Sequence, residues 1–382
     1  MVNPIIVIGS GLAGYNLARN LRKLDKTVAL TIITADRGEF YSKPMLSEAF
    51  AAGKSPGMLV NKTAEQMGSQ LGAEIRTHTS VQRIHPGAHE IELGDRRLSY
   101  SKLVLALGAD AIHPPFAGDG AGDVLSVNDL DDYARFRVAV LAKRRILIVG
   151  AGLIGCEFSN DLASAGHHVD VVDIAPQPLG RLLPPVGGAM LNRSLASVGI
   201  AWHLDTSVRS VERNGTAYRV SLANGEAIET DVVLSAVGLK PRTVLAAAAG
   251  LRTGRGIVVD RLLQTSDPDI YALGDCAEVE GLVLPFTTPI MHGAKALAPT
   301  LAGKATALRY PAMPVVVKTP ACPTVVAPPP TGTVGEWQVS ASGDGVRALY
   351  VDASGTLLGY ALNGSAAHES HALTSQLPVW LS

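Results

Sequence analysis

The stretch IIVIGSGLAGYNLARNLRKL, residues 5–24, places three glycines between a short apolar run and a segment with helical spacing. It predicts a strand over 5–8, a turn, and a helix whose inward side chains are Leu12, Tyr15, Leu17, Leu21 and Leu24. In this context Gly9 permits a tight turn, Gly11 lets a ligand pyrophosphate approach the backbone, and Gly14 lets the helix lie close to the strand. We interpret this first glycine turn as a dinucleotide-binding site, although one isolated copy could equally be an ordinary turn.

A second copy of the pattern, RRILIVGAGLIGCEFSNDLASAGHHVDVVD over residues 144–173, strengthens that interpretation. It predicts a strand over 146–149, a second glycine turn with Gly150, Gly152 and Gly155, a helix that stops at Gly166, and a strand ending on Asp173. A carboxylate at Asp173 would accept hydrogen bonds from an adenine ribose with free hydroxyls and would repel a 2′-phosphate. Two such units predict two bound dinucleotides.

Composition indicates a glycine-punctuated α/β enzyme, with 39 glycines and 5% aromatic residues in 382. The formal net charge of −1 gives no general reason to expect nucleic acid or a membrane surface as a partner. No basic leader or long apolar run is evident, so we expect a cytoplasmic protein. The cysteines Cys156, Cys276 and Cys322 are far apart, which argues against a local dithiol or a metal site and for small buried side chains.

The order of motifs predicts an interleaved α/β fold with two Rossmann-like dinucleotide-binding domains and a small C-terminal α+β domain. The first domain is expected to comprise residues 1–112 and 241–314, with further strands at 28–33 and 103–107. The second is expected over 113–240, and the proline-rich and then alternating sequence of 315–382 forms the third.

Five segments in order, GSGLAG (9–14), ALGA (106–109), GAGLIG (150–155), SAVG (235–238) and YALGDCA (271–277), resemble the FAD-dependent pyridine nucleotide-disulfide oxidoreductases. The resemblance covers nearly the whole chain. It implies that the first domain binds FAD, that the inserted second domain binds NAD, and that the cofactors are FAD and NADH.

Within that family, EFYSKPMLS (39–47), DLDDYARFR (129–137), GAGLIGCEF (150–158) and VKTPACP (317–323) are similar to segments of the members that reduce rubredoxin with NADH. This implies electron transfer from NADH through FAD to the one-electron carrier rubredoxin, by a monomer or weak dimer. Two alternatives remain open: a reductase of flavorubredoxin or ferredoxin, and a non-enzymatic flavoprotein that senses NADH.

The resemblance also assigns residues to the FAD site. Asp275 matches an aspartate that accepts a hydrogen bond from the ribityl chain, although an aspartate here could also be a helix N-cap. Lys43 and Pro44 match positions beside the flavin, and Lys318 is a further candidate for the flavin environment. Relatives carry a ribose-binding glutamate where this chain has Ala35, which leaves two alternatives: the neighbouring Asp36 serves instead, or the ribose hydroxyls bind only water and backbone.

On the NAD side, Glu157 matches a glutamate near the nicotinamide; otherwise it would be an ordinary solvated or capping helix residue. Since no dithiol is available beside the ring, we expect hydride transfer from NADH to the flavin and direct transfer of electrons to the acceptor. No catalytic residue is expected beyond the flavin itself. Rubredoxins are generally acidic, so Lys43, Lys54 and Lys318 are expected to form a basic docking surface.

Overall fold

The computed structural model describes residues 3–382. A parallel sheet, here the first sheet, has the strand order β20-β9-β1-β2-β5. Its strands are β1 (Ile5–Ile8), β2 (Leu30–Ile33), β5 (Glu74–Arg76), β9 (Lys102–Leu105) and β20 (Ile270–Ala272). Because β20 follows β9 by more than 160 residues, the chain leaves this sheet and returns to it.

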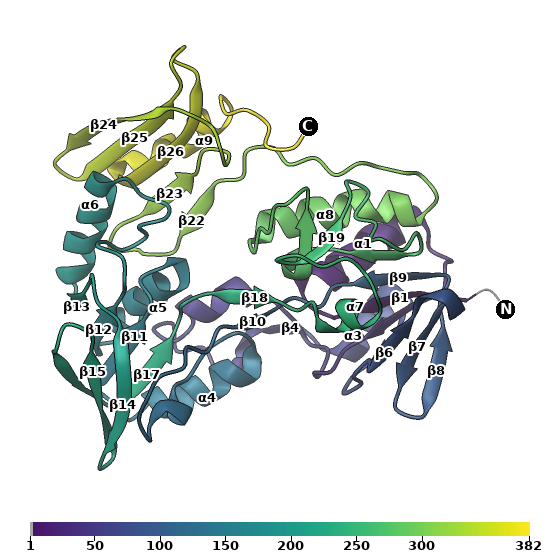
Figure 1. Cartoon of the computed structure of the whole chain (residues 1–382), viewed down its shortest axis with the longest axis horizontal. Helices are drawn as coiled ribbons and strands as arrows, with labels where there is room; N and C mark the ends of the chain where they lie inside the picture. The colour runs from purple at the N-terminus through teal and green to yellow at the C-terminus, as the bar shows by residue number, and fades with distance from the viewer. Residues whose placement is uncertain (1–2) are drawn as a thin grey trace.

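Helices α1 (Leu12–Leu24) and α8 (Thr287–Leu301) pack against each other beside the first sheet (Figure 1). Tyr15, Leu17 and Leu21 are buried as predicted. The prediction for Leu24 is wrong: its side chain is 56% exposed, because it is the last helical residue and the chain turns away at Asp25. The strands expected over 28–33 and 103–107 are also shorter than predicted.

The second sheet is parallel too, with the order β13-β12-β11-β17. It contains β11 (Arg145–Val149), β12 (His168–Val172), β13 (Ile200–His203) and β17 (Val232–Ser235). Around it lie α4 (Leu130–Val140), α5 (Leu153–Ser164), α6 (Pro185–Ala196) and a meander of β14 (Val208–Asn214), β15 (Ala217–Leu222) and β16 (Ala227–Thr230). Gly166 follows the end of α5 with a φ of +87°, which is the left-handed conformation expected of a helix stop.

A third, antiparallel sheet, the C-terminal sheet, has the order β22-β23-β26-β25-β24. Its strands are β22 (Val315–Val317), β23 (Thr324–Ala327), β24 (Glu336–Ser342), β25 (Gly345–Val351) and β26 (Leu357–Gly364), and α9 (Ser370–Thr374) follows. The α/β class with a small C-terminal α+β part is therefore confirmed.

Smaller elements complete the chain. They are β3 (Phe40–Tyr41), α2 (Pro56–Leu59), β4 (Val60–Lys62), α3 (Ala64–Leu71), β6 (Arg83–His85), β7 (Glu90–Leu93), β8 (Arg96–Ser99), β10 (Ala109–Ala111), β18 (Leu239–Pro241), α7 (Val244–Ala248), β19 (Ile257–Val259) and β21 (Ala277–Val279). The antiparallel pair β10 and β18 connects the first sheet to the second (Figure 1). Within residues 3–382, no helix is long and apolar enough to cross a membrane.

One hydrophobic cluster joins three distant parts of the sequence. Phe50, from the excursion between β3 and β4, is buried in the same cluster as Phe136 of α4 and Phe158 of α5. Val326, from the C-terminal sheet, belongs to this cluster as well. The core of the first sheet forms a separate cluster. The excursion of residues 43–59 is therefore packed into the side of the molecule that holds the second and C-terminal sheets.

Candidate functional site

The first glycine turn lies between β1 and α1. Gly9 has a φ of +114°, and a Cβ on it would meet the Ala106 carbonyl oxygen at 2.1 Å. A Cβ on Gly14 would lie 2.0 Å from the Gly9 carbonyl oxygen, so only glycine lets the helix approach this closely. A Cβ on Gly11, by contrast, would meet no heavy atom of the described residues within 4 Å, apart from its chain neighbours and the backbone of its own helix. The turn is therefore packed tightly against the protein at Gly9 and Gly14 and open at Gly11.

The second glycine turn, between β11 and α5, repeats this geometry. Gly150 has a φ of +109°, and a Cβ on Gly155 would lie 1.9 Å from the Gly150 carbonyl oxygen. Gly152 faces open space among the described residues, as Gly11 does. Both turns thus leave room for a phosphate against the backbone at the start of a helix.

An acidic side chain stands beside each turn. Asp36 Oδ1 accepts hydrogen bonds from Thr34 Oγ1 at 2.7 Å and from Ser10 Oγ, inside the first turn, at 3.3 Å. Asp173 follows β12 directly and accepts from the backbone N–H of Ala151, inside the second turn, and of Ala175 at 2.7 Å. Each carboxylate is therefore held at the edge of its glycine turn.

Asp275 and Lys43 are half-buried side chains of opposite charge that lie close enough to influence each other's pKa. Asp275 lies within a short 3₁₀ turn, Gly274–Cys276, and is not the N-cap of a helix. Burial raises the pKa of its carboxyl, and the Lys43 ammonium opposes that shift. Burial likewise lowers the pKa of Lys43, against the effect of Asp275. Asp275 Oδ1 is buried without a hydrogen-bond partner among residues 3–382, which is the condition of an acceptor awaiting a ligand hydroxyl.

Glu157 is the centre of a polar network that joins three parts of the chain. It lies in α5 and is 2% exposed, so it is neither solvated nor a cap. Its Oε1 accepts from the backbone N–H of Lys318 at 3.0 Å. Its Oε2 lies 2.7 Å from Lys318 Nζ and accepts from Ser47 Oγ at 2.5 Å. Lys318 Nζ also donates to Ser47 Oγ at 2.7 Å and to the carbonyl of Pro44.

This network changes the interpretation of two predicted residues and adds one. Lys318 uses its ammonium inside the network, so it is not a solvated charge of a docking surface. Pro44 contributes its carbonyl oxygen to the same ammonium. Ser47 was missed by sequence reasoning, although it closes the EFYSKPMLS segment that carried part of the resemblance.

Further along α5, two more side chains hold the same neighbours. Asp161 accepts from the backbone N–H groups of Phe50 at 2.9 Å and Ala51 at 3.2 Å. Asn160 Oδ1 accepts from the backbone N–H of Ala321 at 3.1 Å. Burial raises the pKa of Asp161 to about 6. Helix α5 is thus hydrogen-bonded both to the excursion of residues 43–59 and to the segment that leads into the C-terminal sheet.

The three cysteines are free and buried, as predicted. Burial raises the pKa of the Cys156 thiol strongly and that of Cys276 to about 11, so neither is a ready nucleophile. Cys156 Sγ contacts the Ala151 carbonyl oxygen and Cys276 Sγ the Leu105 carbonyl oxygen. In the described part of the chain, no group of three or more His, Cys, Asp or Glu side chains is placed to hold a metal ion.

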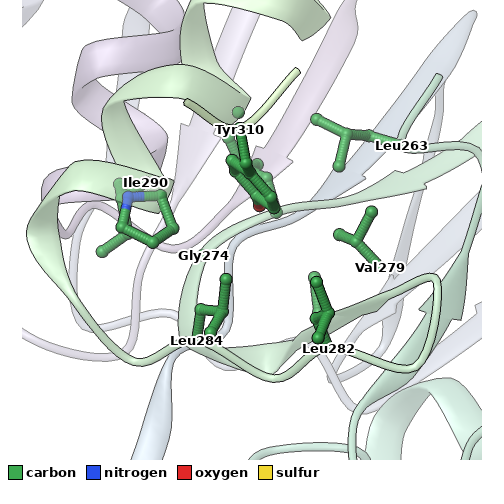
Figure 2. Close-up of a pocket in the computed structure, with 11 residues that line it drawn as sticks. Leu263, Gly274, Val279, Leu282, Leu284, Ile290 and Tyr310 are labelled. Atoms are coloured by element: carbon green, nitrogen blue, oxygen red, sulfur yellow. The ribbon is translucent and has the colours of Figure 1, made fainter. Parts of the chain in front are cut away.

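A small apolar cavity borders the turn that carries Asp275. Figure 2 shows Tyr310 and Leu263 on one side of it and Leu282, Leu284 and Val279 on another, with Gly274 behind. Its volume of about 10 Å³ would hold one water molecule at most, so it is a packing gap and not a nucleotide pocket.

The sequence and the fold both match known proteins. The model of the pyridine nucleotide-disulphide oxidoreductase family matches residues 3–300, and that of the rubredoxin binding C-terminal domain matches residues 307–377. The chain is 48% identical to the rubredoxin-NAD(+) reductase of Alcanivorax borkumensis, over 99% of each chain. It is 38% identical to the nitric oxide reductase FlRd-NAD(+) reductase of Aliivibrio fischeri, over 98% of each chain.

Among solved structures, a ferredoxin reductase from Rhodopseudomonas palustris superimposes with a TM-score of 0.88 at 27% identity, covering 96% of this chain and 93% of that one. The family match extends over both glycine turns and over the return of the chain to the first sheet at β20. The chain belongs to the pyridine nucleotide-disulphide oxidoreductase family.

Proposed function

We propose that this protein is an FAD-dependent reductase that takes electrons from NADH and passes them to rubredoxin. The observation that carries the proposal is the presence, in one chain, of two open glycine turns and a segment, residues 307–377, that matches the rubredoxin binding domain. Near-full-length identity of 48% to a rubredoxin-NAD(+) reductase supports the same choice of acceptor. FAD and NADH are the cofactors that this function requires.

We assign the first glycine turn, with Gly9, Gly11 and Gly14, to the FAD pyrophosphate. Asp275 Oδ1 is a buried acceptor without a protein partner, which fits a ribityl hydroxyl, and Lys43 supplies a positive charge nearby. Asp36, at the edge of the turn, is assigned to the adenosine ribose, in place of the glutamate that relatives carry at the position of Ala35. When bound, FAD accepts a hydride and releases electrons singly. Pro44 and Lys318 hold the protein around it in place.

We assign the second glycine turn, with Gly150, Gly152 and Gly155, to the NADH pyrophosphate. Asp173 stands where a carboxylate accepts hydrogen bonds from free ribose hydroxyls and repels a 2′-phosphate. Glu157, one turn into α5, is assigned to the nicotinamide end, because it faces the excursion of residues 43–59 that follows the first unit.

Three broader assignments belong to the proposal. The FAD-binding domain comprises residues 1–112 and 241–314, the NAD-binding domain 113–240 and the C-terminal domain 315–382. The net charge of −1 suits a protein partner better than nucleic acid or a membrane surface. The protein acts in the cytoplasm as a monomer or weak dimer, which sedimentation and cell fractionation can test.

Rubredoxin docking does not rest on the basic surface that the sequence suggested. The Lys318 ammonium is engaged by Glu157 and Ser47, and Lys43 is half-buried near Asp275. Lys54 belongs to neither arrangement. Residues 307–382 contain three basic and four acidic side chains, not counting histidine. Charge steering by Lys43 and Lys318 is therefore left out of the proposed docking.

A flavorubredoxin reductase is the second candidate, favoured by the 38% identity to a nitric oxide reductase FlRd-NAD(+) reductase. The test is an anaerobic stopped-flow comparison in which the NADH-reduced protein is mixed separately with rubredoxin, flavorubredoxin and ferredoxin. The proposal expects rubredoxin to reoxidise the flavin fastest. Faster reoxidation by flavorubredoxin or ferredoxin would show that that carrier, and not rubredoxin, is the acceptor. Slow reoxidation by all three would favour a non-enzymatic NADH sensor.

A further inference from the structure

We propose that Ser47 is a positioning residue for NADH oxidation, which acts by fixing the orientation of the Glu157 carboxylate toward the nicotinamide. The inference rests on the proposed function, because it takes Glu157 to lie at the nicotinamide end. Ser47 lies in the 3₁₀ helix Lys43–Glu48 and is 3% exposed. It is therefore held by the protein and has no exchange with bulk solvent.

The hydroxyl of Ser47 has one proton to donate and lone pairs with which to accept. Its distance to Glu157 Oε2 is 2.5 Å, while its distance to the Pro44 carbonyl oxygen is 3.2 Å. The shorter, charge-assisted contact takes the proton. Lys318 Nζ, at 2.7 Å, occupies a lone pair of the hydroxyl. The hydroxyl thus bridges the carboxylate and the ammonium.

The lysine has no further freedom in this arrangement. An ammonium has three N–H donors, and Lys318 Nζ has three oxygen partners, which are Glu157 Oε2, Ser47 Oγ and the Pro44 carbonyl. Removing the Ser47 hydroxyl would leave one N–H of Lys318 without its partner and let the ammonium move relative to the Glu157 carboxylate. Ser47 therefore fixes both members of the ion pair.

The two oxygens of Glu157 are left unequal by these contacts. Oε2 receives Ser47 Oγ and Lys318 Nζ, whereas Oε1 receives only the backbone N–H of Lys318. Since each carboxylate oxygen can accept about two hydrogen bonds, Oε1 keeps one acceptor position. We assign that position to a donor of NADH, the carboxamide N–H₂ or a ribose hydroxyl, with its direction set by the Ser47 bridge. Because Glu157 is 2% exposed, NADH must displace neighbouring side chains to reach it.

The test is anaerobic stopped-flow reduction of the FAD-loaded protein by NADH. We expect Ser47→Ala to lower the limiting rate constant of flavin reduction about tenfold, equivalent to about 1.4 kcal/mol, and to change the NADH dissociation constant much less. Ser47→Thr keeps the hydroxyl and should restore most of the rate. Ser159→Ala is the matched control, because it removes a buried hydroxyl of the same helix that bonds only to Cys156 O. It should reduce at the wild-type rate.

A double variant shows whether Ser47 acts through Glu157. The Ser47→Ala/Glu157→Gln protein should be no slower than Glu157→Gln alone, because residues in one network are not additive. Equal slowing by Ser47→Ala in both backgrounds would overturn the proposal, as would a wild-type rate in Ser47→Ala or in Glu157→Gln. If the alanine variant does not hold FAD, Ser47→Gly removes the hydroxyl in a second way. Loss of FAD from both would show a structural role and also overturn it.

The proposed function can fail separately. If the wild-type protein shows no reduction of its flavin by NADH, the function itself is wrong. If the wild-type protein is reduced and the Ser47→Ala protein is reduced equally fast, only the positioning role is wrong.

Discussion

At the scale of single residues, the FAD assignment rests on the buried Oδ1 atom of Asp275. This oxygen has no partner within residues 3–382, so a ligand hydroxyl there would gain a charge-assisted hydrogen bond worth roughly 1.5 to 3 kcal/mol. Asp275→Ala should therefore bind FAD about ten to a hundred times more weakly and purify with less colour. Asp95→Ala, which changes an exposed aspartate in a turn, is the control. Undiminished FAD affinity in Asp275→Ala would refute the assignment.

Asp173 decides between the two nicotinamide cofactors. Its carboxylate would repel the 2′-phosphate of NADPH, so the wild-type kcat/KM should strongly favour NADH. The next residue, Ile174, is 75% exposed and can be changed without loss of core packing. Asp173→Ser combined with Ile174→Arg should shift the preference toward NADPH. Because Asp173 also accepts from the N–H groups of Ala151 and Ala175, the variant should lose activity with NADH too. Equal kcat/KM values for both cofactors in the wild type would contradict the reading of Asp173.

At the scale of elements, α5 connects the excursion of residues 43–59 to the segment that leads into the C-terminal sheet. Burial raises the pKa of Asp161 in this helix to about 6. A raised pKa means that the folded state holds the proton more tightly, so this stabilisation is full below the unfolded pKa and is lost as the pH rises through about 6. Between pH 5 and pH 8 the wild type should lose on the order of 1 kcal/mol of unfolding free energy relative to Asp161→Asn.

Denaturant unfolding at both pH values measures this difference. Asp95→Asn serves as the control, since the Asp95 carboxylate is exposed and lies in a turn outside α5. Parallel pH profiles for the wild type and Asp161→Asn would show that the carboxyl is not perturbed in the folded protein.

The two glycine turns could be predicted from the sequence because their constraints are local. A Cβ on Gly9 would lie 2.1 Å from a backbone atom, and a Cβ on Gly14 would lie 2.0 Å from one, so no other residue fits at either position. The spacing of the glycines alone therefore predicts the turn. Leu24 was misplaced for a similar reason: helical periodicity gives the face of a side chain but not whether the core extends to the last turn.

The Glu157 network could not be predicted in the same way. Lys318 lies 161 residues from Glu157, and Ser47 lies 110 residues from it. No periodicity or turn signal relates such positions; they meet only because α5 packs between the excursion of residues 43–59 and the start of the C-terminal sheet. A resemblance assigned Glu157 and Lys318 to different cofactors, whereas the fold places them in contact.

At the scale of the whole molecule, one hydrophobic cluster joins the second sheet, the C-terminal sheet and the excursion of residues 43–59. The hydrophobic cluster with Phe50, Phe158 and Val326 ties the excursion of residues 43–59 to the second and C-terminal sheets. The NADH side and the segment that matches a rubredoxin binding domain are therefore parts of one packed unit. Since the three cysteines are buried and apart, electrons have no dithiol to pass through.

The most direct measurement of the account is the anaerobic stoichiometry of electron transfer. Limiting NADH is mixed with the protein and excess oxidised rubredoxin, while flavin and rubredoxin absorbance are followed together; the variant with Cys156, Cys276 and Cys322 changed to serine is run in parallel. The account predicts that the flavin is reduced first, that two rubredoxins are then reduced per NADH, and that the serine variant behaves alike. It is contradicted if NADH reduces the flavin but rubredoxin stays oxidised, or if the serine variant keeps a reducible FAD and yet fails to pass electrons on.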